Sequence, residues 1–159
     1  MKYISIRVSP SKIFYAIGEK LEDRFVYSLD SVIVPQILET PKKLSYIRNV
    51  FESIITQQQI VFAGIRLAET NSKTQSLDRV YIEAVIQEFF SNSTIEHYRT
   101  LRLAGMSSIL NLKNQELKEW IDNKNTPDRL QELFEDWSTL TKEDREALVV
   151  LFCTMEAFK

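Results

Sequence analysis

The sequence predicts an α/β fold built on a five-stranded mixed sheet, with three antiparallel strands followed by two parallel ones and helices on its faces. Three observations support this prediction. Apolar and polar residues alternate near the start of the chain, the apolar period becomes helical after Pro41, and a compact apolar run follows at 60–67. Consecutive strands followed by alternating helices and strands are typical of a sheet that is covered by helices.

The N-terminal quarter predicts three strands joined by short turns. In residues 2–9 isoleucine and valine occupy every second position, which is the period of a strand. Residues 12–18 are apolar and rich in residues that favour strands, and residues 24–34 supply the third. Because only short turns separate these segments, we expect an antiparallel meander.

The middle of the chain predicts two helices and two more strands. A helix follows from Pro41 to about Thr56, and residues 60–67 form a buried strand. A second helix at 75–90 precedes a short strand at 94–100. Strands that are reached through crossover helices should run parallel to the first. The buried stripe of the second helix is predicted to comprise Leu77, Val80, Tyr81, Ala84, Val85 and Phe89.

The remainder of the chain predicts helices. Residues 101–111 fit either a helix or a partly irregular loop, and residues 114–122 form a short helix. Thr126-Pro127 opens another helix. The last helix begins at Thr141, and Asp144 stands three residues later in the spacing of a capping box.

Composition limits the classes of function. The 159 residues suit one domain, 1–159, and the formal net charge of -2 disfavours a strongly basic nucleic-acid binder. One cysteine, Cys153, and one histidine, His97, exclude an internal disulfide, a thiolate cluster and a multi-histidine metal site. The sequence contains no glycine-rich phosphate loop, so we expect no nucleotide cofactor. No signal-peptide core or long apolar run occurs, so we expect a cytoplasmic protein with no membrane partner.

Three short stretches carry a family resemblance. Residues 5–9 read Ser-Ile-Arg-Val-Ser and enter the second strand, residues 62–67 read Phe-Ala-Gly-Ile-Arg-Leu, and residues 143–148 read Glu-Asp-Arg-Glu-Ala-Leu. Together with the order of strands and helices, they resemble the Holliday junction resolvase branch of the ribonuclease H-like superfamily. That family typically has an Asp in the first strand, a Glu in the fourth, and two acids three residues apart before an Ala-Leu pair.

The chain departs from this pattern at both strands. Arg7 stands where the family has its first-strand Asp, and Arg66 stands where it has the Glu. Two-metal phosphodiester cleavage needs carboxylates from several elements around two Mg²⁺ ions about 4 Å apart. A guanidinium cannot bind a cation, but it pairs readily with a carboxylate such as Glu143 or Glu146. The resemblance therefore implies a lost metal site with no cofactor.

Other interpretations of these residues stay open. Arg7 also fits a solvated position on an edge strand, whereas Arg66, inside an apolar run, needs an acidic or phosphate partner. The acids at the start of the last helix also fit favourable interactions with the helix dipole. In another register, Glu69 supplies a carboxylate at the end of the fourth strand, and Asp30 lies in the third.

Three functions follow as hypotheses. The first is a resolvase-like protein without a metal site, acting as a non-catalytic nucleic-acid-associated or scaffolding component. The second is an active Mg²⁺-dependent endonuclease with a rearranged site, for which the catalytic candidates are Glu69, Glu143 and Glu146. The third is a protein-interaction module. DNA is a candidate partner, and the resemblance implies a homodimer. The candidate nucleic-acid-binding residues are Arg7, Arg66, Arg99 and Arg102, although 22 acids against 20 Lys and Arg also fit scattered surface charge.

Overall fold

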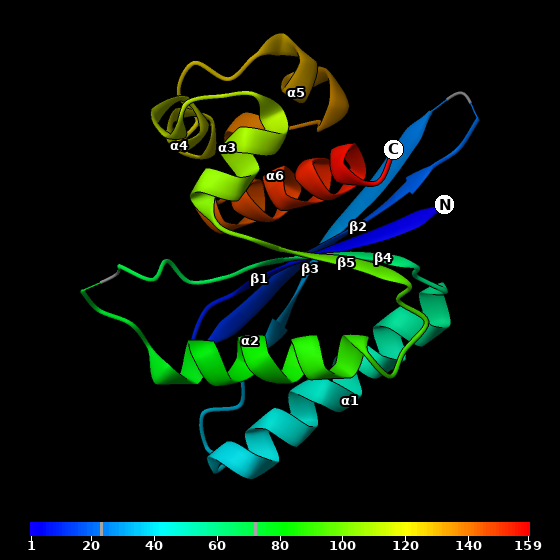
Figure 1. Ribbon diagram of the computed structural model, residues 1–159, viewed down its shortest axis with the longest axis vertical. Helices are drawn as coiled ribbons and strands as arrows, with labels where there is room; N and C mark the ends of the chain where they lie inside the picture. Colours follow the sequence, from blue (N-terminus) through cyan, green and yellow to red (C-terminus); the bar gives the residue numbers. More distant parts are fainter. Residues whose placement is uncertain (23, 72) are drawn as a thin grey trace.

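The computed structural model describes residues 1–22, 24–71 and 73–159, and it places five strands in one sheet between two layers of helices (Figure 1). The sheet order is β3-β2-β1-β4-β5; β2 is antiparallel to β1 and β3, and β4 is parallel to β1 and β5. The predicted mixed sheet is therefore confirmed. The strands are β1 (Lys2–Val8), β2 (Lys12–Lys20), β3 (Phe25–Ile33), β4 (Phe62–Arg66) and β5 (His97–Leu101).

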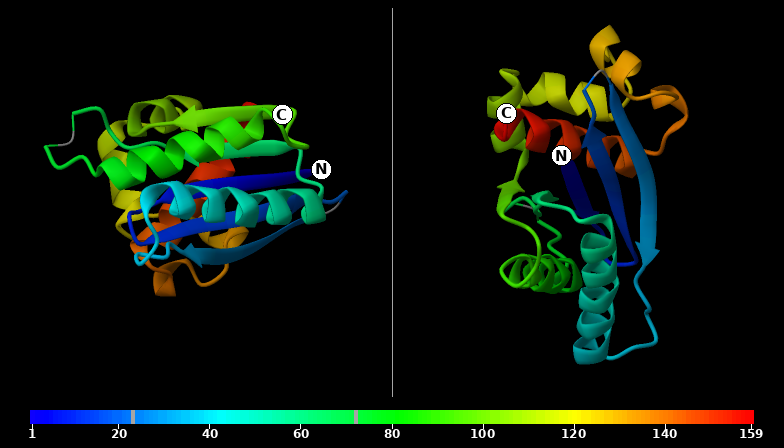
Figure 2. Two further views of the ribbon diagram at one scale, coloured as in Figure 1. Left: turned by 90° about the horizontal axis from the view of Figure 1, so that it is seen from below. Right: turned by 90° about the vertical axis from the view of Figure 1, so that its right-hand side faces the viewer.

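One face of the sheet is covered by α1 (Thr40–Gln58) and α2 (Leu77–Phe90), which lie together below the sheet in Figure 1 and in front of it in the left view of Figure 2. Ile47, Phe51 and Ile55 of α1 recur at four-residue spacing and are fully buried. That spacing places all three on one side of the helix, facing the sheet. The apolar core on this face includes Ile4, Ile6, Val8, Ile13, Ile65, Ile82, Ile86 and Phe89.

The buried side of α2 differs from the predicted stripe. Leu77 and Tyr81 are 66% and 44% exposed, whereas Ile82 and Ile86 are fully buried. The prediction was right for Phe89, which is 1% exposed, and wrong for Leu77 and Tyr81. Because α2 is apolar around much of its circumference, its apolar residues alone do not indicate which side meets the sheet. Packing against α1 and the strands decides the rotation of the helix.

The opposite face is covered by α6 (Lys142–Ala157), along which every residue from Arg145 to Thr154 is buried. The predicted cap of this helix is confirmed, since the Thr141 hydroxyl accepts a hydrogen bond from the Asp144 backbone N–H at 3.1 Å. The surrounding helical elements are α3 (Leu103–Leu110), α4 (Asn114–Ile121), α5 (Asp128–Leu133) and a 3₁₀ turn (Trp137–Thr139).

The structure assigns two stretches of the C-terminal half. Residues 101–111 contain the end of β5 and then α3, so the helical alternative is the observed one. The helix expected after Thr126-Pro127 is short and ends at Leu133, although Phe134 and Trp137 beyond it remain buried. No helix among the described residues has both the length and the apolar composition needed to cross a membrane.

Cys153 lies on α6 and its side chain is fully buried. Burial raises the pKa of the Cys153 thiol to about 12, with the nearby charge of Glu156 adding to the shift. The thiol is therefore protonated at neutral pH. Only the thiolate form of cysteine is strongly nucleophilic, so Cys153 is unreactive. Cys153 therefore acts as a small apolar core residue.

Arg145 is a buried cation that joins three parts of the helical layer. It is 8% exposed. Its Nε donates to the carbonyl oxygen of Ile121 at 2.7 Å, and its Nη1 donates to the carbonyl oxygens of Leu140 and Trp137. We expect Arg145→Met to lower the free energy of unfolding by about 1–3 kcal/mol, because these buried carbonyls lose their donors.

Urea denaturation checks this expectation, with Arg129→Met as the control. The Arg129 side chain is 71% exposed, so its replacement should have a much smaller effect. Equal unfolding midpoints for the two variants would contradict the structural role of Arg145.

Candidate functional site

The two arginines that depart from the family pattern lie side by side at the carboxyl ends of β1 and β4. Arg7 and Arg66 are direct partners in the parallel register of these strands. Both guanidinium groups bind one carboxylate, that of Glu146 in the second turn of α6. The Arg7 Nε lies 2.9 Å from Glu146 Oε2, and the Arg66 Nε lies 2.9 Å from Glu146 Oε1. Glu146 therefore bridges two neighbouring cations, and we call these residues, with Glu69, the arginine–glutamate cluster.

Arg66 is fully engaged within the chain. It is 7% exposed, and its Nη2 lies 2.7 Å from Oε1 of Glu69, the fourth member of the cluster. Its Nη1 donates to the carbonyl oxygens of Leu67 and Leu101. The need for a partner, which the apolar surroundings of Arg66 predicted, is thus met by two carboxylates and two carbonyl groups.

Arg7 is more buried than a residue on a solvated edge strand would be. One interpretation of the sequence placed it on such a strand, but β1 is the central strand of the sheet. The Arg7 side chain is 17% exposed. The edge-strand interpretation is therefore wrong. β2 pairs with one side of β1 and β4 pairs with the other, so β1 has a neighbouring strand on each side.

Glu69 connects the cluster to the next part of the chain. Its Oε1 accepts a hydrogen bond from the backbone N–H of Leu103, the first residue of α3, at 2.9 Å. Burial alone would raise the pKa of Glu69, but this hydrogen bond and the charges of Arg66 and Arg102 outweigh burial and hold the pKa below its ordinary value. Glu69 is therefore an ionised partner of Arg66 and a cap for α3.

The pKa of Glu146, like that of Glu69, is set by burial acting against nearby positive charges. Burial alone would raise its pKa, but the charges of Arg7 and Arg66, together with their hydrogen bonds, lower it below the ordinary value. The Glu146 carboxylate is therefore negatively charged at neutral pH. Both of its oxygens are occupied by guanidinium donors.

A second polar network, which was not among the sequence predictions, lies beside the cluster. Glu83 of α2 is 5% exposed and accepts hydrogen bonds from the backbone N–H of Ala68 at 3.0 Å and from Arg79 Nε at 2.7 Å. The carbonyl oxygen of Ala68 accepts from Arg102 Nε at 3.0 Å. These contacts hold the segment that follows β4. The four-residue spacing of Arg79 and Glu83 on one helix was the available signal.

The remaining candidates lie outside the cluster. Glu143 is partly exposed, and within the described ranges it forms no ion pair. Asp30 accepts a hydrogen bond from Tyr15, which belongs to the core on the α1 side of the sheet. Arg99 is exposed with its guanidinium over the ring of Phe158, 5.6 Å from the centroid. The four candidate arginines therefore occupy different environments.

The cluster borders a hollow of about 560 Å³, and its residues do not fit a Mg²⁺ site. Arg66, Glu69 and Glu146 line this hollow together with Lys118 and Lys142. Mg²⁺ requires oxygen ligands free to coordinate it, whereas the Glu146 oxygens contact two guanidinium groups. In the part of the chain that the structure describes, no group of three or more His, Cys, Asp or Glu side chains could hold a metal ion.

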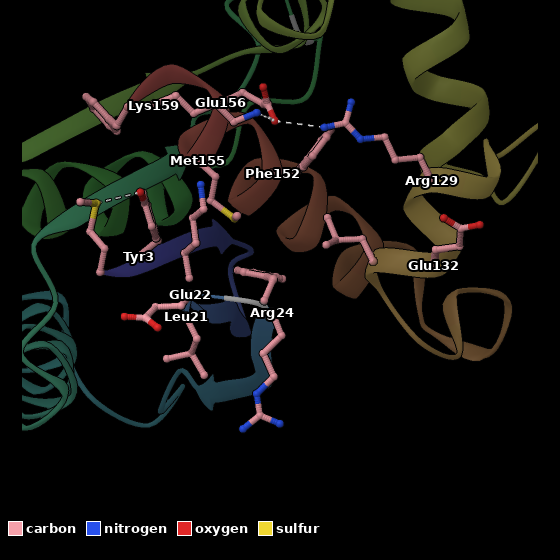
Figure 3. A pocket seen from close by; sticks show the side chains of 15 residues that line it. Tyr3, Leu21, Glu22, Arg24, Arg129, Glu132, Phe152, Met155, Glu156 and Lys159 are labelled. Atoms are coloured by element: carbon pink, nitrogen blue, oxygen red, sulfur yellow. Dashed lines mark hydrogen bonds and ion pairs between the residues drawn. The ribbon is translucent and has the colours of Figure 1, made fainter.

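A larger hollow lies at the other end of the sheet (Figure 3). It measures about 980 Å³ and is bordered by residues 20–22, by α5 and by the end of α6. The side chains that line it include Tyr3, Leu21, Phe152 and Met155. Charged side chains, among them Arg24, Arg129 and Glu156, line it as well, and the arginine–glutamate cluster does not contribute to it.

Comparisons with known proteins support the fold. No protein-family model and no curated protein matches the sequence. Among solved structures, Thermus thermophilus RuvC has a TM-score of 0.75 at 7% identity, with 99% of this chain and 95% of that chain covered. The same protein in complex with a Holliday junction substrate has a TM-score of 0.73, with the same identity and coverage.

A viral protein is similar as well. The Fowlpox virus resolvase, in a structure with its substrate Holliday junction DNA, has a TM-score of 0.59 at 15% identity, with 99% of both chains covered. At these identities the comparisons establish the fold and leave the chemistry to the residues of this chain. The chain has the ribonuclease H-like fold in the form that Holliday junction resolvases share, over nearly its whole length.

Proposed function

We propose that this protein is a resolvase-fold component that associates with nucleic acid or with an assembly around it and does not cleave DNA. One observation supports this above all: the Glu146 carboxylate is bound by Arg7 and Arg66 at 2.9 Å each. Two cations adjoin the position where a nuclease of this fold would hold Mg²⁺. A divalent ion there would meet electrostatic repulsion from both.

DNA is the proposed partner because two resolvases of this fold have been captured with Holliday junctions. The exposed cation Arg102 is the proposed contact with DNA phosphates, since Arg66 is engaged within the chain. With a net charge of -2, such binding should be weak and should fall steeply with added salt.

The test combines metal binding with cleavage. Calorimetric titration of the protein with Mn²⁺ should give no binding at the cluster, and a labelled four-way junction should remain intact with Mg²⁺ or Mn²⁺. A gel-shift assay should still detect salt-sensitive retention of the junction. Specific Mn²⁺ binding that is lost in Glu146→Gln, or junction cleavage, would overturn the proposal.

A variant with restored carboxylates serves as the positive control. Arg7→Asp with Arg66→Glu places acids where the resolvase pattern has them, beside Glu69 and Glu146. We expect this double variant to bind Mn²⁺ measurably, because four carboxylates would then surround the former cation pair. A matched pair at exposed positions, Arg99→Asp with Arg129→Glu, should bind no better than the unmodified protein.

An active nuclease with a rearranged site is the second candidate. The observation in its favour is that Glu69 and Glu146 both contact Arg66 and border the same hollow. Glu143 would supply the third carboxylate. This candidate requires Mg²⁺-dependent cutting of branched or single-stranded DNA that disappears in Glu146→Gln.

A protein-interaction module without a nucleic-acid role is the third candidate. The exposure of Leu77 and Tyr81 on α2 favours a protein contact, and a homodimer formed through this side of α2 is part of the proposal. The absence of any salt-sensitive retention of the junction would favour this candidate over the first. The cytoplasmic location stays a prediction.

A further inference from the structure

β5 forms one edge of the sheet, and most of its residues are exposed. It pairs with β4 on one side, and it is the last strand in the sheet order. No described helix or strand lies beside its outer edge in Figures 1 and 2. The first four residues of β5, His97 to Thr100, are all exposed, so both faces of the strand are accessible there.

The backbone groups at this edge can be assigned from the pairing with β4. The His97 N–H donates to the Val61 carbonyl oxygen, and the Leu101 carbonyl oxygen accepts from the Leu67 N–H. Successive residues of a strand direct their backbone groups to opposite sides. The N–H and C=O groups of Tyr98 and Thr100 therefore point outward, which presents two donors and two acceptors to an added strand.

The positive charge of Arg99, beside this edge, bears on which kind of chain could pair with β5. Arg99 lies between the two outward-facing residues, and among residues 1–22, 24–71 and 73–159 it has no acidic partner within 4 Å. A second copy would use all four outward groups by pairing Tyr98 with Thr100 in antiparallel fashion. That register sets Arg99 directly opposite Arg99 of the other copy, which is unfavourable for like charges.

Nucleic acid matches this edge less well than a peptide does. Phosphate groups would be attracted to Arg99, but they supply only acceptors. The outward carbonyl groups of Tyr98 and Thr100 require donors, and a peptide backbone supplies both donors and acceptors. A carboxylate on the added strand, opposite Arg99, would satisfy the remaining charge.

We propose that the outer edge of β5 binds an extended, acidic segment of another protein, which joins the sheet as a sixth strand. The backbone groups of Tyr98 and Thr100 form the hydrogen bonds, and Arg99 selects an acidic partner while disfavouring self-association. This mode of recognition draws affinity from the backbone and specificity from the flanking side chains. It is independent of the arginine–glutamate cluster.

The probe is a blocked eight-residue peptide of alternating glutamate and valine, with a lysine–valine peptide for comparison, measured by fluorescence anisotropy. Thr100→Pro removes an outward N–H without removing a hydrogen bond to β4, so the glutamate peptide should bind about tenfold more weakly. Thr100→Val keeps the backbone donor and should bind as the unmodified protein does. Arg99→Glu should bind the lysine peptide in preference to the glutamate peptide.

Backbone amide exchange gives a second measurement, since the Tyr98 and Thr100 N–H groups should become protected when the glutamate peptide binds. No peptide binding by the unmodified protein would overturn the proposal, as would equal binding by Thr100→Pro and Thr100→Val. A dimer that Thr100→Pro disrupts would assign the edge to a second copy. Duplex DNA binding that Arg99→Glu abolishes, with no peptide binding, would assign it to nucleic acid; either result also overturns the proposal.

Discussion

Glu146→Gln is expected to lower the free energy of unfolding by about 3–5 kcal/mol, the usual cost of removing one partner from a buried ion pair. The amide keeps the size of the side chain but removes the negative charge between Arg7 and Arg66. Because these two residues are register partners on adjacent strands, their guanidinium groups would then face each other without a carboxylate between them. Urea denaturation measures the change.

Glu143→Gln is the matched control, since it removes a carboxylate from the same end of α6. Glu143 is partly exposed, and its contribution through the helix dipole is at most about 1 kcal/mol. A triple variant that replaces Arg7, Arg66 and Glu146 with methionine and leucine should recover most of the lost stability, because no buried charge of the cluster is then left unpaired and Glu69, whose side chain is 43% exposed, remains in contact with solvent. Similar losses for Glu146→Gln and Glu143→Gln would contradict the bridging role of Glu146.

The same carboxylate makes stability depend on pH in a defined direction. The folded-state pKa of Glu146 is lower than its ordinary value of 4.5, so the unfolded chain binds this proton more readily than the folded chain does. The stabilisation is complete above the ordinary pKa and is lost as the pH falls through the folded-state pKa. Unfolding measured from pH 7 downward should show a smaller acid-dependent loss in Glu146→Gln.

Gly64→Ala is expected to destabilise the protein by about 1–3 kcal/mol or more, the cost of overpacking a core position. Gly64 lies on β4 beneath α6. A Cβ atom there would stand 1.9 Å from Thr154 Oγ1 and 3.3 Å from Val150 Cγ1. Thr154 cannot easily move, because it is fully buried and its hydroxyl donates to the Val150 carbonyl oxygen at 2.7 Å. The substitution therefore forces β4 and α6 apart.

Gly105→Ala provides the contrast, since among the described residues no atom outside its own stretch of helix lies within 4 Å of a Cβ at that position. Gly105 is inside α3, where alanine should stabilise the helix by about 0.5–1 kcal/mol. Adding Thr154→Ala to Gly64→Ala removes the clashing hydroxyl and should recover part of the stability. If thermal unfolding shows equal effects for the two glycine variants, β4 and α6 are not in close contact at Gly64.

The order of strands and helices was predictable because each element has its own local pattern. The alternation at 2–9, the helical period after Pro41 and the capping signal at Thr141 all correspond to observed elements. The buried face of α2 was not predictable, since the exposure of Leu77 and Tyr81 depends on how the helix is rotated against α1 and the sheet. Local periodicity does not determine such a rotation when a helix is apolar on several sides.

The candidate site divides in the same way. The amino-acid pattern alone indicated that Arg66 needs an anionic partner, because a guanidinium inside an apolar strand is costly without one. It left Glu143, Glu146 and Glu69 as candidates. Only the packing of α6 over the register of β1 and β4 brings Glu146 to Arg7 and Arg66, across 139 and 80 residues of chain, and leaves Glu143 outside. Contacts across such separations depend on how whole elements assemble, which no single stretch of sequence contains.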